Sequence, residues 1–225
     1  MKENNLGKTL LYALGEILLV VVGILIAVQI DHWNEGRKDR TREAFLIKEI
    51  NREMKKNLEL FDATGSRLRT ISNAGDSLIR LFPLSERFFN NPKKKEKFDK
   101  FIRTFILVGS FDPSQGAIKS IINSGEIGII TNDTLRSLIV AWEDKIRDYK
   151  EEEKVAWDYG YQFLDWLSTN FPNPNEVTVD YSRIDYYAFQ GKIVEKTSRV
   201  WYVGYGEDQE AFRNYLLEII ELTDN

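Results

Sequence analysis

An unbroken apolar stretch lies near the start of the chain. From Leu10 to Ile30 there are 21 consecutive residues, of which only Glu16 and Gln29 are strongly polar. As a helix this stretch spans roughly 31 Å, the thickness of a bilayer core. A cleaved signal peptide has a shorter apolar region followed by small residues, whereas Asp31 and His32 follow directly here. The pattern predicts an uncleaved transmembrane anchor, and the alternative is a buried helix of a soluble protein.

Beyond this stretch, apolar residues recur at intervals of three, four and seven, the spacing of one helix face. This spacing predicts a long amphipathic helix over residues 44–82, continuing from the anchor, with Gly65 and Gly75 as candidate breaks. Pro83 and the polar run at 90–97 predict a loop after it.

Further helices are predicted in the second half of the chain. One of them begins at Asp112-Pro113 and ends at Gly125. Three others cover residues 98–106, 135–166 and 207–222. Between the last two, residues 177–181 alternate like a strand and 184–189 could be helical, so 171–206 is predicted to be irregular and rich in aromatic residues. The predicted class is therefore mainly all-α: an N-terminal tail and single transmembrane helix over 1–31, and an extramembrane, antiparallel helical bundle over 32–225.

One face of the predicted anchor carries a carboxylate and small residues together. At 100° per residue, Glu16, Gly23 and Ala27 fall within one stripe roughly 80° wide. Small residues four apart let two helices approach closely, and a partner helix could hydrogen-bond the acid in place of lipid. We expect these three residues to contact another helix in the membrane. The alternative is that Glu16 reaches the nearer headgroups without a partner.

The apolar stretch and its flank form a specific signature. It reads YALGEILLVVVGILIAVQI over residues 12–30, followed by Trp-Asn-Glu at 33–35 and basic residues. This signature resembles that of an uncharacterised family of small single-pass bacterial membrane proteins, with weaker echoes in FDPSQGA at 111–117 and SGEIGII at 124–130. The resemblance implies an anchor, a helical extramembrane domain and no catalytic residues. Members often carry a basic extension before the anchor and two asparagines before the tryptophan, and this chain departs from both patterns.

Composition removes several classes of function. The chain contains no cysteine, which excludes disulfides, thiolate metal sites and a cysteine nucleophile. A net charge of -4 argues against a nucleic-acid partner. The single histidine, His32, has only Glu35 at a useful spacing, too few ligands for a metal site. We find no nucleotide-binding motif and expect no catalytic residue and no cofactor.

The orientation in the membrane is open from sequence. Lys2 and Lys8 precede the anchor, whereas five basic residues follow it, at positions 37, 38, 40, 42 and 48. The positive-inside rule thus favours a cytoplasmic bundle. The basic N-terminal extension of the resembling family favours the opposite. We favour a bacterial inner-membrane protein with a periplasmic bundle, because the family pattern is averaged over many relatives.

Thirteen aromatic residues crowd positions 157–205. Most of them are expected to form core, because large rings dominate burial. Some, with Trp166, Tyr187 and Trp201 as candidates, could form a ligand or partner surface. We therefore expect a non-enzymatic interaction or assembly protein that contacts the lipid bilayer and forms a homo-oligomer or binds another membrane protein. The alternative is a membrane-anchored, sensor-like ligand-binding domain that uses the aromatic region.

Overall fold

The computed structural model describes residues 4–170 and 181–224, and every regular element in them is a helix. In chain order they are α1 (Asn4–Ile79), α2 (Glu86–Phe89), α3 (Pro92–Phe105), α4 (Gly116–Asn123), the 3-10 helix η1 (Glu126–Ile129), α5 (Asp133–Asn170), the 3-10 helix η2 (Tyr181–Arg183), α6 (Tyr186–Tyr205) and α7 (Glu207–Thr223). The predicted all-α class is confirmed for the described part of the chain.

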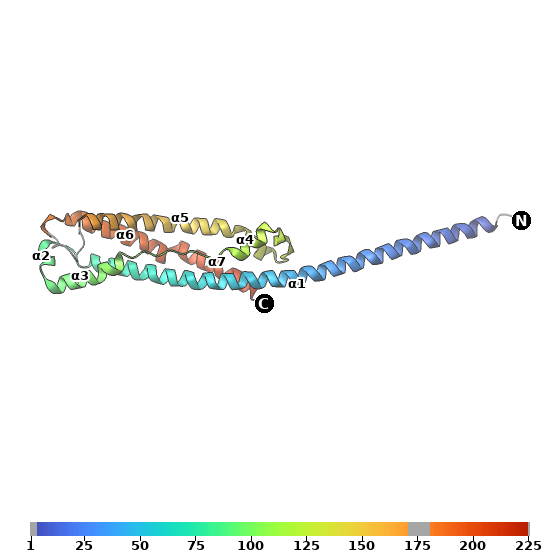
Figure 1. Ribbon diagram of the computed structural model, residues 1–225, viewed down its shortest axis with the longest axis horizontal. Helices are drawn as coiled ribbons and strands as arrows, with labels where there is room; N and C mark the ends of the chain where they lie inside the picture. Colours follow the sequence, from blue (N-terminus) through green and yellow to red (C-terminus); the bar gives the residue numbers. More distant parts are fainter. Residues whose placement is uncertain (1–3, 171–180, 225) are drawn as a thin grey trace.

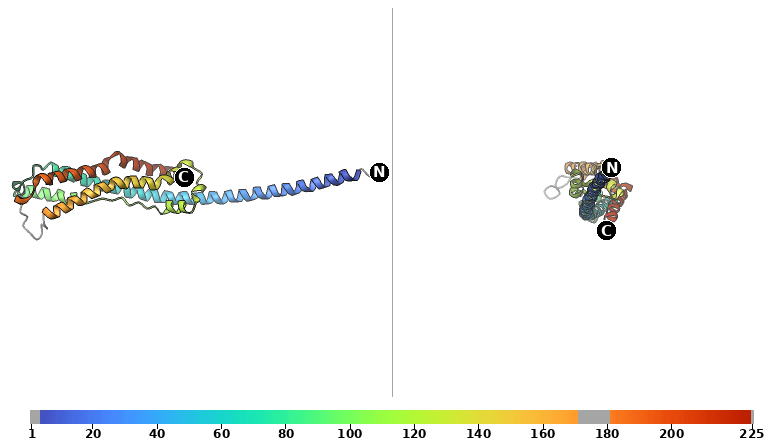
Figure 2. Two further views of the ribbon diagram at one scale, coloured as in Figure 1. Left: turned by 90° about the horizontal axis from the view of Figure 1, so that it is seen from above. Right: turned by 90° about the vertical axis from the view of Figure 1, so that its right-hand side faces the viewer.

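Helix α1 joins the two parts of the molecule. It contains 76 residues and is therefore roughly 114 Å long. Its C-terminal half packs into a bundle, and its N-terminal half projects alone from one end of that bundle (Figure 1). Figure 2 shows that the bundle is narrow when seen along its long axis, and that α1 projects from one end when the molecule is seen from above. The amphipathic helix thus continues directly from the apolar stretch, as the sequence predicts.

The bundle is antiparallel. Helices α1 and α5 run away from the projecting end, and α6 and α7 return in line with each other, contacting both (Figure 1). At the far end, Gln190 of α6 accepts a hydrogen bond from the backbone N–H of Leu84 at 3.2 Å. At the near end, Asn51 of α1 donates to Thr223 of α7 at 3.0 Å. The chain therefore ends beside the point where α1 enters the bundle.

A cluster of aromatic rings forms the middle of the core. The ring centroid of Phe61 in α1 lies 5.0 Å from that of Phe111, 5.2 Å from that of Tyr149 and 5.3 Å from that of Phe212. Fully burying one such ring contributes roughly 1.5–3 kcal/mol, and each favourable ring pair adds roughly 0.5–1.5 kcal/mol. The cluster thus joins α1, α5, α7 and the segment between α3 and α4.

Three glycines that the sequence marks as helix breaks or stops serve different purposes. Gly65 and Gly75 do not break α1, contrary to the prediction, and both are helical. A Cβ at Gly75 would collide with Oγ1 of Thr197 in α6 and lie 2.8 Å from the ring of Phe105, so close packing requires glycine there. Gly125 has φ +76° and follows α4, which confirms the predicted stop.

Two predicted boundaries between residues 90 and 116 are wrong. Most of the predicted loop at 90–97 is the first turns of α3, where Asn91 accepts a hydrogen bond from the N–H of Lys94 at 3.2 Å and Pro92 occupies the first turn. The pair Asp112-Pro113 does not open α4, which begins at Gly116. Asp112 binds Lys150 of α5 instead, at 2.8 Å.

The predicted irregular region at 171–206 is also wrong over its second half. Residues Tyr186–Tyr205 form α6, whose N-terminus is capped by Asp185 accepting from the N–H of Ala188 at 2.9 Å. Residues 171–180, including most of the strand-like alternation, lie outside the described part of the chain. The predicted helices over 135–166 and 207–222 are confirmed as α5 and α7.

We expect Gly75→Ala to lower the free energy of unfolding of the full chain by roughly 1–3 kcal/mol, because the added methyl group overpacks the contact between α1 and α6. Alanine has the higher helix propensity, so an effect of helix propensity alone would have the opposite sign. Gly36→Ala in the same helix is the matched control, since no atom lies within 4 Å of its Cβ position. Urea unfolding followed by circular dichroism measures both, and a stabilised Gly75→Ala would contradict the close contact.

Candidate functional site at the junction of the extension and the bundle

The projecting part of α1 exposes its apolar side chains. Those at residues 14–30 are all exposed, for example Leu19 at 76% and Ile17 at 62%. Within the described ranges, α1 is the one helix long and apolar enough to cross a membrane. Trp33, at the end of this stretch, is 64% exposed, and the Arg37 guanidinium lies over its ring at 5.8 Å. The side chain of Tyr12, at the other end of the apolar stretch, lies outside the described side chains.

The three residues predicted to contact another helix all lie on this projecting part. Glu16, Gly23 and Ala27 are exposed, and a Cβ at Gly23 would meet no atom within 4 Å. Their spacing places them on one side of the helix. The bundle does not cover this side, so it is open to contact from outside the chain.

Two side chains at the start of the bundle tie α1 to η1 and to the residues between η1 and α5. Arg42 donates from Nε and Nη2 to the carboxylate of Glu126 at 2.6 and 2.8 Å. Next to it, Glu43 accepts from the backbone N–H and the hydroxyl of Thr131 at 2.6 and 2.7 Å. The hydrogen bonds from Arg42 hold the pKa of Glu126 below its usual range. Such exposed contacts add little stability, but the bidentate Arg42–Glu126 pair and the two hydrogen bonds to Glu43 define the orientation of α1 at the junction.

The segment at 107–115, between α3 and α4, runs extended across the bundle without a neighbouring strand. Buried backbone N–H and C=O groups need hydrogen-bond partners, and here side chains of the helices supply them. Asn57 of α1 supplies two of these hydrogen-bond partners. Its Nδ2 donates to the carbonyl of Ser114 and its Oδ1 accepts from the N–H of the same residue, both at 2.8 Å.

Helix α5 holds the middle of this segment through a buried carboxylate. Glu153 is 4% exposed and accepts from the backbone N–H of Phe111 at 2.6 Å. Lys150 lies 2.7 Å from Glu153 and 2.8 Å from Asp112, so it pairs with both acids. The hydrogen bond from Lys150 lowers the pKa of Asp112. The buried charge of Glu153 therefore has both a backbone donor and a cation.

A buried lysine and a tryptophan hold the start of the segment. Lys196 of α6 is 1% exposed and donates to the carbonyls of Phe105 and Leu107, the latter at 3.3 Å. Its ammonium group also lies 4.8 Å from the ring centroid of Phe105. Trp157 of α5 donates from Nε1 to the carbonyl of Gly109 at 2.8 Å. Burial lowers the pKa of Lys196 to about 8.

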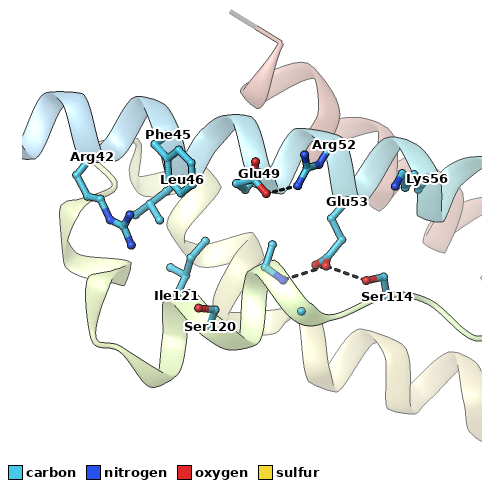
Figure 3. A pocket seen from close by; sticks show the side chains of 12 residues that line it. Arg42, Phe45, Leu46, Glu49, Arg52, Glu53, Lys56, Ser114, Ser120 and Ile121 are labelled. Carbon is cyan, nitrogen blue, oxygen red and sulfur yellow. Dashed lines mark hydrogen bonds and ion pairs between the residues drawn. The ribbon is translucent and has the colours of Figure 1, made fainter.

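The end of the segment is held by Glu53 of α1, which caps α4. Its carboxylate accepts from the hydroxyl of Ser114 and the N–H of Ala117, both at 2.9 Å, and from the N–H of Ile118 at 3.4 Å (Figure 3). A carboxylate at this position satisfies free N–H groups of the first helical turn and complements the helix dipole. Glu53 thus binds α4 to the face of α1.

A groove of about 410 Å³ lies beside this cap, between α1 and α4 (Figure 3). Its lining includes three cationic side chains of α1: Arg42, Arg52 and Lys56. Arg42 is engaged by Glu126, and Arg52 is engaged by Glu49. Because Glu53 already caps the N-terminus of α4, this helix end has no free charge to offer an anion.

The three aromatic candidates do not come together. Trp166 of α5 is half-buried and stacks on Phe189 of α6, with ring centroids 5.1 Å apart. Tyr187 and Trp201 lie on the exposed side of α6 and are 88% and 50% exposed. They therefore do not line one cavity with Trp166. His32 and Glu35 are both exposed, and the described residues contain no group of three or more His, Asp or Glu side chains that could hold a metal ion.

Sequence reasoning missed the side chains that hold the extended segment. Glu53, Asn57, Glu153 and Lys196 were not among the candidates, although all four are buried. A signal existed in α1, where Glu53 and Asn57 are four residues apart on the face that carries apolar residues. Polar residues at inward positions of an amphipathic helix need buried partners.

The fold and the junction define a class of protein. It is a helical bundle that contains the C-terminal half of one very long helix, and the N-terminal part of this helix is apolar and exposed. Residues 16–150 match the model of a family of unknown function, DUF6090, and the chain belongs to this family. No curated protein and no solved structure matches the chain. The matched range contains both echoes seen in the sequence, and these are the segments bound by Asn57, Glu53 and Arg42.

Lys196 predicts a pH dependence of stability. Its pKa is about 8 in the folded chain against 10.5 ordinarily, so between these values the folded chain has released a proton that the unfolded chain still holds. Stability contributed by this group therefore rises with pH across the window and is lowest below pH 8. We expect the gain in unfolding free energy from pH 8 to 10.5 to be roughly 3 kcal/mol larger in the parent chain than in Lys196→Met.

Urea unfolding at several pH values measures this difference. Lys100→Met is the control, since Lys100 lies exposed on α3. The control variant should follow the pH profile of the parent chain. Parallel profiles for the parent chain and Lys196→Met would show that the buried ammonium group does not titrate in this window.

Proposed function

We propose that this protein is a single-pass protein of the bacterial inner membrane whose helical bundle, outside that membrane, works through contacts rather than catalysis. In this proposal the apolar part of α1 crosses the lipid bilayer. The face with Glu16, Gly23 and Ala27 then contacts a second copy of the chain or another membrane protein. The function is assembly in the envelope.

One observation carries the proposal: the exposed apolar part of α1 is continuous with the helix on which the bundle is built. Exposed apolar surface of this extent marks an interaction or membrane site. Since Arg42 and Glu43 tie α1 to η1 and to Thr131, which precedes α5, the bundle cannot rotate freely about the anchor. An anchor contact would then set the relative position of two bundles.

The buried charged groups support a role in contacts. Glu53, Glu153 and Lys196 each bond to backbone groups of the segment around residues 105–118. These groups are buried and their hydrogen bonds hold the fold, whereas general acid-base catalysis requires a group within reach of the substrate. A ligand-binding role for the aromatic region has less support, because Trp166 faces the core while Tyr187 and Trp201 face solvent.

The location is tested with a single cysteine at Glu96→Cys, in the native cysteine-free background. Glu96 is exposed on α3, at the end of the bundle far from the anchor (Figure 1). The full chain should sediment with membranes, and a membrane-impermeant maleimide should label it in intact spheroplasts. Labelling only after lysis would reverse the proposed orientation, and a well-folded chain in the detergent-free supernatant would contradict the anchor itself.

The anchor contact is tested with Asn34→Cys, which lies seven residues beyond Ala27 and so on the same side of α1. We expect oxidation in membranes to give a disulfide-linked dimer, and Gly23→Leu in this background to reduce it at least threefold, because the larger side chain prevents close approach. Val21→Leu, on the opposite side of the helix, is the matched control. Equal crosslinking of Asn34→Cys when combined with Gly23→Leu and when combined with Val21→Leu would show that Gly23 is not at a helix contact.

A further inference from the structure

Helix α6 has two apolar faces, and the bundle buries only one of them. On the other face, α1 contacts Tyr205, whose hydroxyl donates to Oδ1 of Asn73 at 3.4 Å. The covered face carries Phe189, Ile193, Val200 and Val203, each at most 4% exposed. The open face carries a second row of six residues, all classed as exposed. We name this row the α6 seam: Tyr187, Gly191, Val194, Ser198, Trp201 and Tyr205.

The spacing within the seam is that of a coiled coil. Successive members are four, three, four, three and four residues apart, which is the alternation of the inward positions of a heptad. At 100° per residue all six fall within roughly 80° on the side opposite the buried face. Tyr187 is 88% exposed, and Val194, Trp201 and Tyr205 are 47%, 50% and 42% exposed. A helix face that contacts only water does not require apolar and aromatic residues at this spacing.

We infer that the α6 seam is the surface through which the bundles of two copies of this chain pair, in parallel and in register. The inference rests on the proposed function, because it requires both copies to be anchored in one membrane. Two anchors inserted with the same orientation make α1 of both copies run the same way. Helix α6 runs antiparallel to α1 in each copy, so the two α6 helices are parallel to each other (Figure 1).

The seam residues suit such a pair. When the two helices pair in register, each seam residue faces the same residue of the other copy. Gly191 and Ser198 then form two layers of small residues that let the backbones approach. Large side chains fill the layers beside them. Neither small residue serves a contact within the bundle: no atom lies within 4 Å of the Cβ position of Gly191, and Ser198 is exposed.

The area is adequate for a membrane-bound pair. From their exposed fractions, the four larger seam side chains of both copies together would remove roughly 900 Å² from water. Stable soluble interfaces begin at about 1,200 Å², to which the residues flanking the seam would also contribute. Confinement of both anchors to one membrane raises the effective concentration, so a modest interface suffices.

The test uses the full chain in native membranes with Ser198→Cys at the centre of the seam. Oxidation should convert at least half of this variant to a disulfide-linked dimer. Asp165→Cys, exposed on α5, is the matched control and should remain below one tenth dimer. Val194→Lys in the Ser198→Cys background should lower the dimer at least fivefold, and circular dichroism should show an unchanged helical fold because Val194 is exposed.

The outcomes separate this inference from the proposed function. If the chain is a dimer by light scattering in mild detergent but Ser198→Cys fails to crosslink, the seam is overturned and assembly through the anchor stands. If Ser198→Cys and Asp165→Cys crosslink equally, the contact is random collision and the seam is also overturned. If the chain is a monomer and no position crosslinks, both the seam and the proposed assembly function are overturned. Selective Ser198→Cys crosslinking that Gly23→Leu leaves unchanged supports the seam without the anchor contact.

Discussion

A length of extended backbone packed among helices has no neighbouring strand, so its N–H and C=O groups must find partners on side chains. In this protein the segment at 107–115 imposes that requirement on the three long helical elements around it. Helix α1 meets it with Asn57, α5 with Glu153 and Trp157, and α6 with Lys196. Each of these contacts also fixes the helix that makes it, so the segment is what positions α1 and α5 relative to each other.

The same requirement explains the buried charges of the bundle. A carboxylate or ammonium group in the core is costly unless it is paired or hydrogen-bonded. Glu153 has a backbone donor and Lys150, Glu53 has the N-terminus of α4, and Lys196 has two carbonyls. These polar contacts are spread along the bundle, from Glu53 near the junction to Lys196, whose partner Phe105 packs beside Gly75 near the other end of α1. They therefore hold the helices together over the length of the bundle.

Local patterns in the sequence predicted α1, α5 and α7, but they missed α6 and misplaced some boundaries. Apolar periodicity located α1, α5 and α7, and Gly125 marked the end of α4, because these signals depend on residues close in the chain. The Asp112-Pro113 pair reads as a helix start, but Lys150 binds the aspartate from a distant helix. Gly75 is predicted to break the helix, whereas in the structure it lets Thr197 and Phe105 pack closely against α1. Both errors have the same cause: a contact across the bundle outweighed a local preference.

The sequence by itself determined the all-α class, the exposed apolar extension and the absence of cysteine chemistry, since each follows from composition or from spacing along one helix. The tertiary structure decided what Glu53, Asn57, Glu153 and Lys196 do, because their partners lie on segments 42 to 91 residues away. It also decided which aromatic residues face solvent. Apolar residues lie on two sides of α6, and only packing against α1 and α5 shows which side stays exposed.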